Sequence, residues 1–85
     1  MKFKLIPYIK HQLYQLKDSK NKNVYLEIKL NRSKFGNILY VDSYKEYYSK
    51  GFFNQQQINE ILKIVELLAD NKYITEIELE LNRGE

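Results

Sequence analysis

The strongest constraint on the fold is an alternation of aliphatic and other residues in the middle of the chain. Large aliphatic residues take every second position from 24 to 30, namely Val24, Leu26, Ile28 and Leu30. Because successive side chains of a β-strand point to opposite faces, this period of two predicts a strand with one buried face. Its other face would carry Tyr25, Glu27, Lys29 and Asn31.

A second strand is predicted to return beside the first. Residues 32–37 are polar or glycine apart from Phe35 and end in Gly-Asn, as expected of a hairpin loop of several residues. Residues 38–44 form the returning strand, with Leu39 and Val41 in the core. Its opposite face would carry Tyr40, Asp42 and Tyr44. The chain therefore contains an antiparallel β-hairpin.

A single helix is predicted to follow, from about residue 55 to about residue 70. Asn54 is a competent N-cap, and Gln57 three residues later completes the pattern of a capping box. Aliphatic residues at helical spacing form a core stripe, which consists of Ile58, Ile61, Leu62, Val65 and Leu68. Ile64 and Leu67 widen this stripe beyond what one sheet face requires. Residues 71–72 end the helix.

Two arrangements would cover the wide apolar arc of this helix. Residues 73–81 alternate strictly, with Glu76, Glu78 and Glu80 on one side, and are predicted to be a strand that folds back over the helix. In the other arrangement, Ile64, Leu67 and Leu68 meet a symmetry-related helix of a second copy. We favour the homodimer, with these three aliphatic residues at its interface.

The N-terminal segment supports two interpretations. Residues 2–5 alternate between lysine and apolar residues, as in a half-buried strand. Ile9, Leu13 and Leu16 then recur at helical spacing, whereas residues 8–14 also alternate as a strand would. Periodicity therefore leaves residues 8–16 open between helix and strand. The polar residues 18–23 that follow predict a turn.

Composition argues against most catalytic chemistry. The 85 residues include no Cys and a single imidazole, His11, so there is no thiol nucleophile, no disulfide and no thiolate metal site. A Ser-His-Asp triad would have to be built around His11, and no nucleophile-elbow motif is present. The glutamates of residues 76–80 suit a solvated strand face rather than converging metal ligands. We expect a non-enzymatic protein without metal or cofactor.

Length and hydropathy predict one soluble domain. Residues 1–7 lack the apolar stretch of a signal peptide, and no run approaches the roughly 20 apolar residues of a membrane span. We expect a cytoplasmic protein, without membrane contact, whose single domain 1–85 has a core-like part at residues 2–70 and an extra strand at 73–81. Lys, Asn, Ile and Tyr are abundant and Ala69 is the single alanine, which suggests the AT-rich coding of a low-GC bacterium or phage.

Positive charge and tyrosine are concentrated in the first fifty residues. Residues 1–50 carry eleven Lys and Arg against four Asp and Glu, and seven of the eight tyrosines. Lysine attracts phosphate and exposed rings stack on bases, which is the combination that single-strand binders use. The predicted nucleic-acid-binding residues are Tyr25, Lys29, Arg32, Lys34, Phe35, Tyr40, Tyr44, Lys45 and Lys50. Tyr47 and Tyr48 have the same character. Alternatively, these lysines solvate a turn and these tyrosines form the rims of a packed sheet.

Three stretches resemble, in this order, the positive-cofactor-four family of transcriptional coactivators, including its short bacterial and phage members. Residues 24–30 (VYLEIKL) are similar to an inner strand, and residues 36–44 (GNILYVDSY) to the glycine-led second strand. Residues 50–54 (KGFFN), with Ile58, Ile61 and Leu62 after them, are similar to the entry into the long helix. Residues 2–6 also look like the first strand of the bacterial members, so the resemblance covers about residues 2–68.

The resemblance implies a fold and a function. The fold would be a curved antiparallel sheet of four strands followed by one helix, an α+β architecture in which residues 8–16 are strand. Two copies would pair through their helices, and single-stranded DNA would lie across the basic, aromatic sheet surface without strong sequence preference. The protein would act in transcription, replication or recombination.

Two departures from the family pattern keep a second hypothesis open. Relatives commonly place an arginine in the second strand, where this chain has Asp42 and Ser43. Residues 72–85 add an acidic strand that the minimal family lacks. The second hypothesis is a small inhibitor or adaptor of a phage or mobile element that binds a host protein, with exposed tyrosines as interface anchors. RNA is the alternative nucleic acid.

Overall fold

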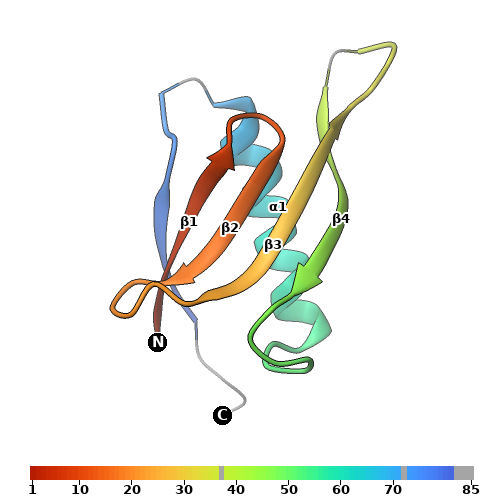
Figure 1. The fold of residues 1–85 in the computed structure, drawn as a ribbon. Coiled ribbons are helices and arrows are strands. Elements are labelled where there is room, and N and C mark those ends of the chain that lie inside the picture. Colours follow the sequence, from red (N-terminus) through yellow and green to blue (C-terminus); the bar gives the residue numbers. More distant parts are fainter. Residues whose placement is uncertain (37, 72, 82–85) are drawn as a thin grey trace.

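An antiparallel meander of four strands forms most of the sheet. The computed structural model describes residues 1–36, 38–71 and 73–81. The strands are β1 (Lys2–Ile9), β2 (Leu13–Asp18), β3 (Val24–Arg32) and β4 (Leu39–Glu46), followed by helix α1 (Gln55–Asp70) and strand β5 (Ile77–Glu80). The sheet order is β4-β3-β2-β1-β5, so the segment that contains α1 connects the two edges of the sheet (Figure 1). The predicted α+β fold with an additional C-terminal strand is confirmed.

The helix packs against one face of the sheet and forms the core with it (Figure 1). The sheet contributes fully buried side chains at Phe3, Leu5, Leu16, Leu26 and Ile28, and the helix contributes Ile58, Ile61, Val65 and Leu68. The predicted capping box is present, because Asn54 Oδ1 accepts the N–H of Gln57 at 2.8 Å and Gln57 Oε1 accepts the N–H of Asn54 at 3.0 Å. The helix boundaries predicted from this signal are confirmed. Asn37 and Lys72, predicted in the hairpin loop and at the helix end, lie outside the described residues.

The N-terminal segment is a hairpin, so the helical interpretation of residues 8–16 is wrong. β1 and β2 are joined by a tight turn, in which the N–H of Gln12 donates to the carbonyl of Ile9 at 3.0 Å and His11 has a φ of 63°. Leu16 lies opposite Leu5, and both are completely buried. Pairing with a neighbouring strand buries this segment in a way that local helical spacing cannot show.

A β-bulge in β3 overturns the predicted position of Tyr25. Leu16 lies opposite Leu26 and Lys17 lies opposite Val24, so Tyr25 is the extra residue. The bulge places Tyr25 on the same side of the sheet as Leu26, where it is 4% exposed. Its ring lies 5.1 Å from that of Phe3, between centroids, and edge-on to it. Tyr25 is therefore a core residue and does not share the outer face with Lys29.

A second bulge, in β4, separates two tyrosines that were predicted to share a face. Lys29 lies opposite Ser43 and Leu30 opposite Val41, which leaves Asp42 as the extra residue. Residues directly opposite each other in a sheet point to the same side. Tyr40, opposite Asn31, therefore lies on the uncovered face, whereas Tyr44, opposite Ile28, lies on the helix side.

The C-terminal strand extends the sheet and does not cover the helix. β5 pairs with β1 from Lys2↔Glu80 to Leu5↔Ile77 and is shorter than predicted. Before it, Asn71 Oδ1 accepts the N–H groups of Tyr73 at 2.8 Å and Ile74 at 3.2 Å, which forms a turn where a strand was expected. The acidic outer face is present on the described strand at Glu78 and Glu80, which are exposed.

The predicted dimer interface is only partly available. Leu68 is 5% exposed and belongs to the core of its own chain, so its assignment to the interface is wrong. Ile64 packs against the same core and is half-buried. Leu67 is 72% exposed and β5 leaves it uncovered, so the lid arrangement is also wrong for this residue. The homodimer stays a prediction that rests on Ile64 and Leu67. Within the described part of the chain, α1 is too short and too polar to cross a membrane.

Candidate functional site

The face of the sheet that α1 leaves uncovered, called the open face below, is rich in lysine. The strand register places lysines from four strands on it, namely Lys2, Lys4, Lys17, Lys29 and Lys45. Three glutamates share this face, and two of them, Glu78 and Glu80 of β5, lie directly opposite Lys4 and Lys2. The β5 side of the open face is therefore close to neutral in charge, and the positive surplus lies toward β3 and β4.

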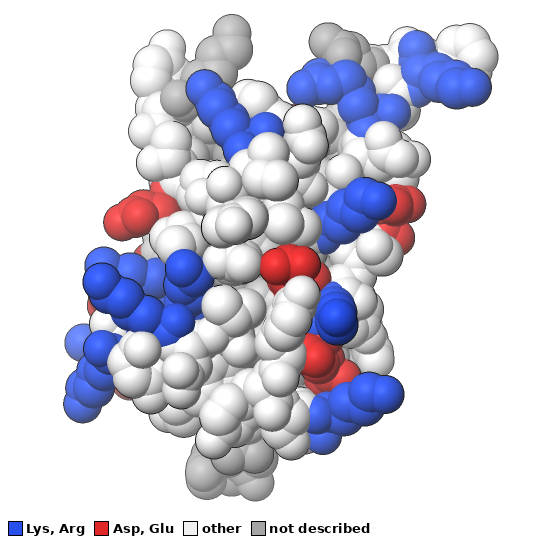
Figure 2. Space-filling model, in the orientation of Figure 1, with Lys and Arg blue, Asp and Glu red and all other residues white. Residues whose placement is uncertain are grey.

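A column of cationic side chains follows β3 and β4. We call Lys29 and Lys45, which lie on the open face, together with Lys34 of the hairpin loop between these strands, the basic column. Figure 2 shows blue side chains running over these strands from the hairpin loop to the opposite end, with carboxylates beside them. Lys45 lies opposite Glu27, and Asn31, which lies opposite Tyr40 on the open face, is four residues further along β3, so this stretch is about 13 Å long at about 3.3 Å per residue. The arrangement can neutralise several phosphates in a row.

Three aromatic rings accompany the basic column. Phe35 in the hairpin loop is 100% exposed, and Tyr40 and Tyr47 are also exposed. The loop that carries Phe35 is closed by a hydrogen bond from the N–H of Ser33 to the carbonyl of Ile38 at 2.9 Å. Lys45 Nζ lies 4.8 Å from the centre of the Tyr47 ring, within the range of a cation–π contact. These rings can serve as stacking surfaces for unpaired bases.

A polar network holds Tyr47 against the open face. Tyr47 Oη donates to Glu27 Oε1 at 3.1 Å, and Gln15 Nε2 donates to Glu27 Oε2 at 3.1 Å. Gln15 is buried although it lies on the open face, so the carboxylate of Glu27 is oriented from both sides. The hydrogen bonds fix the direction of the Tyr47 ring while leaving about half of the side chain exposed.

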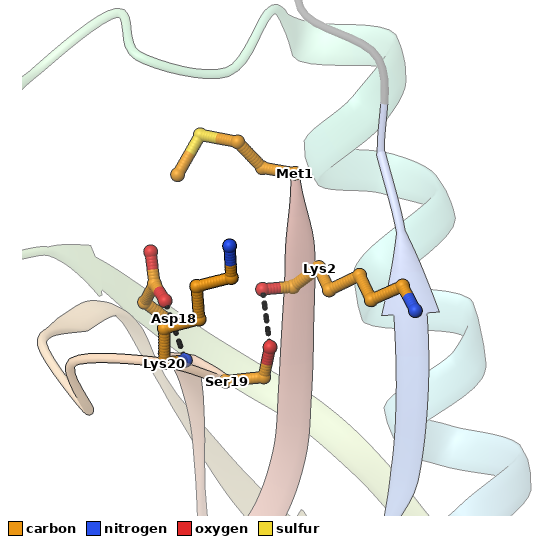
Figure 3. Close-up of a pocket in the computed structure, with 5 residues that line it drawn as sticks. All are labelled: Met1, Lys2, Asp18, Ser19 and Lys20. Atoms are coloured by element: carbon orange, nitrogen blue, oxygen red, sulfur yellow. Dashed lines mark hydrogen bonds between the residues drawn. The ribbon is translucent and has the colours of Figure 1, made fainter.

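A hollow of about 460 Å³ lies beside Met1 and the β2–β3 turn. Its lining side chains stabilise this turn, and we assign it no ligand. Figure 3 shows the carboxylate of Asp18 and the side chain of Lys20 on one side of β1, while the side chain of Lys2 points to the other side. Asp18 Oδ1 accepts the N–H of Lys20 at 2.7 Å, and Ser19 Oγ donates to the carbonyl of Lys2 at 3.1 Å. These bonds close the turn and attach it to β1.

The structure brings together Lys29, Lys34, Phe35, Tyr40 and Lys45 and removes two tyrosines and one arginine from the predicted site. Arg32 lies opposite the buried Leu39 and therefore points to the helix side, and Lys50 is exposed in the segment between β4 and α1. Tyr25 is in the core, where its ring stacks on that of Tyr48 at 4.5 Å between centroids, and Tyr44 lies on the helix side. Lys17 and Gln15 were missed, because only the register of β2 against β3 places them on the open face. Lys2 and Lys4 were also missed, although their alternation with Phe3 and Leu5 in the sequence indicates that they face away from the core. Among the described residues, no three His, Asp or Glu side chains lie close enough together to hold a metal ion.

No family model and no curated protein matches the chain, and no solved structure matches the fold. The resemblance to the positive-cofactor-four family therefore stays a prediction. Its implied order of four strands and a helix agrees with the element order found, to which β5 is added.

Proposed function

We propose that the protein binds single-stranded nucleic acid, DNA in particular, along the basic column and without catalysis. The observation that carries the proposal is the coincidence of this column with the exposed rings of Phe35, Tyr40 and Tyr47. The single imidazole of the sequence, His11, lies in the β1–β2 turn. Transcription, replication or recombination in a bacterial or phage setting is the corresponding cellular role.

Two kinds of contact would act together on the bound strand. Lysine and arginine side chains contact phosphates irrespective of sequence, and each base that stacks on a ring contributes about 1–3 kcal/mol. In a duplex the base faces are already stacked on one another, so only the phosphate contacts remain. The geometry thus favours an unpaired strand with weak sequence preference.

Fluorescence anisotropy with a labelled oligo-dT, a duplex of equal length and a matching RNA oligonucleotide tests the proposal. We expect oligo-dT to bind at least about tenfold more tightly than the duplex, because one engaged ring already contributes that much. A series in salt should give a slope of log K against log salt of about −2 to −3.5 for three to five phosphate contacts. Equal affinity for both forms, or no binding of either, contradicts the proposal and favours the protein-partner hypothesis.

The proposal includes a homodimer that pairs through the outer side of α1. Leu67 is the largely exposed aliphatic residue of this helix, and Ile64 is half-buried one turn before it. At tens of micromolar, light scattering should give the mass of a dimer for the parent protein. Leu67→Glu should give the mass of a monomer without lowering the melting temperature, because this side chain supports little of the core. A parent protein with the mass of a monomer would contradict the homodimer. The anisotropy experiment would still test nucleic-acid binding by the single chain.

A further inference from the structure

A hollow on the helix side of the sheet has no role in the proposed nucleic-acid site. It has a volume of about 360 Å³ and lies between the β1–β2 hairpin and the C-terminal end of α1. Its apolar wall includes Pro7 of β1, Leu68 and Ala69 of α1, and Ile74 after the helix. Pockets of a few hundred Å³ with apolar walls and a few polar groups are typical of small-molecule sites.

Five polar side chains of the described residues line this hollow, namely Lys10, His11, Tyr14, Asn71 and Thr75, and the buried one among them is Tyr14. Tyr14 is 4% exposed, and its hydroxyl has no hydrogen-bond partner among the described residues. Every fully enclosed side-chain nitrogen or oxygen of the described residues does have a partner, so the Tyr14 hydroxyl is not fully enclosed, and the Tyr14 side chain lines the hollow. Burial raises the pKa of this hydroxyl above its ordinary value of 10.0, which keeps it protonated and able to donate.

The charges around the hollow favour an anion. Lys10 and His11, both exposed in the β1–β2 turn, line it, and no carboxylate appears among its described lining residues. Asp70 of α1 lines an adjoining hollow with Leu67 and Tyr73, and Asn71 lines both hollows. A ligand here would meet a hydroxyl donor and a cation on one side and aliphatic carbon on the other.

We infer that this hollow binds a small carboxylate with a compact apolar body. The carboxylate accepts the proton of the Tyr14 hydroxyl and lies near Lys10, and the apolar body packs against Leu68, Ala69 and Ile74. The site belongs to the helix side of the sheet and is independent of the basic column on the open face. It adds a small-molecule ligand to a protein for which the sequence suggested only macromolecular partners.

Titration of ¹⁵N-labelled protein with 4-methylpentanoate and with phenylacetate, followed by NMR, tests the inference. The matched neutral probes are 4-methylpentanamide and phenylacetamide, which have the same apolar bodies. We expect at least one carboxylate to shift the amide signals of Lys10, His11, Ala69 and Asn71 at millimolar concentration, and the corresponding amide to bind about tenfold more weakly. Absence of localised shifts with both carboxylates, or equal binding of acid and amide, overturns the inference.

Two variants that each lose one tyrosine hydroxyl test whether carboxylate binding depends on the hydroxyl in this hollow or on any tyrosine hydroxyl of the protein. Tyr14→Phe removes only the hydroxyl and should weaken carboxylate binding about tenfold, since a hydrogen bond to a charged group is lost. Because that hydroxyl has no described protein partner, the variant should fold and melt as the parent does. Tyr47→Phe, the same change on the open face, is the control and should leave carboxylate binding unchanged. Undiminished binding by Tyr14→Phe contradicts the assigned role.

Discussion

Replacing Lys29, Lys34 and Lys45 together with alanine is expected to weaken oligo-dT binding about 50-fold at about 0.15 M salt, if each side chain contacts one phosphate of the strand. Each such contact changes the slope of log K against log salt by about 0.7, so the slope should become shallower by about 2. All three side chains are exposed, so the melting temperature should stay within a few degrees of the parent value. Anisotropy at several salt concentrations measures the affinity for oligo-dT and the slope of its dependence on salt.

A matched triple variant serves as the control for net charge. Lys20, Lys22 and Lys63 are exposed lysines away from the basic column, two in the β2–β3 turn and one on α1. Their replacement with alanine removes the same charge but should weaken binding only about threefold and leave the slope nearly unchanged. Equal losses in the two triple variants would mean that the protein attracts DNA by overall charge and that the basic column is not the site.

Replacing Tyr25 with alanine is expected to lower the free energy of unfolding by about 3–5 kcal/mol, the usual cost of truncating a large buried ring. Tyr25 contacts an aromatic cluster in which its ring lies 4.8 Å from that of Phe52 and 6.2 Å from that of Phe53, between centroids. A domain of this size has about 5–15 kcal/mol of stability in total, so the variant should unfold in far less urea. Urea denaturation followed by circular dichroism measures the change.

The conservative variant Tyr25→Phe tests whether the ring of residue 25 packs in the core or stacks on a DNA base. It retains the buried ring and should bind oligo-dT with the parent affinity, while losing no more than about 1.5 kcal/mol of stability. Full stability of Tyr25→Ala together with weaker DNA binding would contradict the core assignment. That result would instead restore the exposed position that alternation along the strand predicted.

Much of the fold was predictable because its signals are local. The alternation from Val24 to Leu30 identifies β3, and the pair Asn54 and Gln57 identifies the start of α1, because capping needs only residues three apart. The wide apolar arc of the helix was interpreted incorrectly at Leu68, because the sequence does not show how much of the helix the sheet covers. The pairing of β5 with β1, which puts β4 and β5 at opposite edges of the sheet, joins segments far apart in the sequence and has no local signal.

The site was less predictable because it depends on register. The bulges at Tyr25 and Asp42 each reverse the alternation, and a shift of one residue exchanges the two faces of a strand. For that reason Tyr25 and Tyr44 were assigned to the wrong side. The cationic residues of the hairpin were identified correctly as exposed, since turn composition alone predicts solvent exposure there.

The most direct test of the account maps bound oligo-dT onto the ¹⁵N-labelled protein by NMR. If the strand lies along the basic column, amide signals of β3, β4 and the hairpin that carries Phe35 should shift on titration. Signals of the outer side of α1, including Gln56 and Lys63, should stay in place, because the sheet separates this side from the open face. Shifts confined to α1, or no shifts at an oligo-dT concentration that saturates anisotropy, would contradict the proposed binding surface.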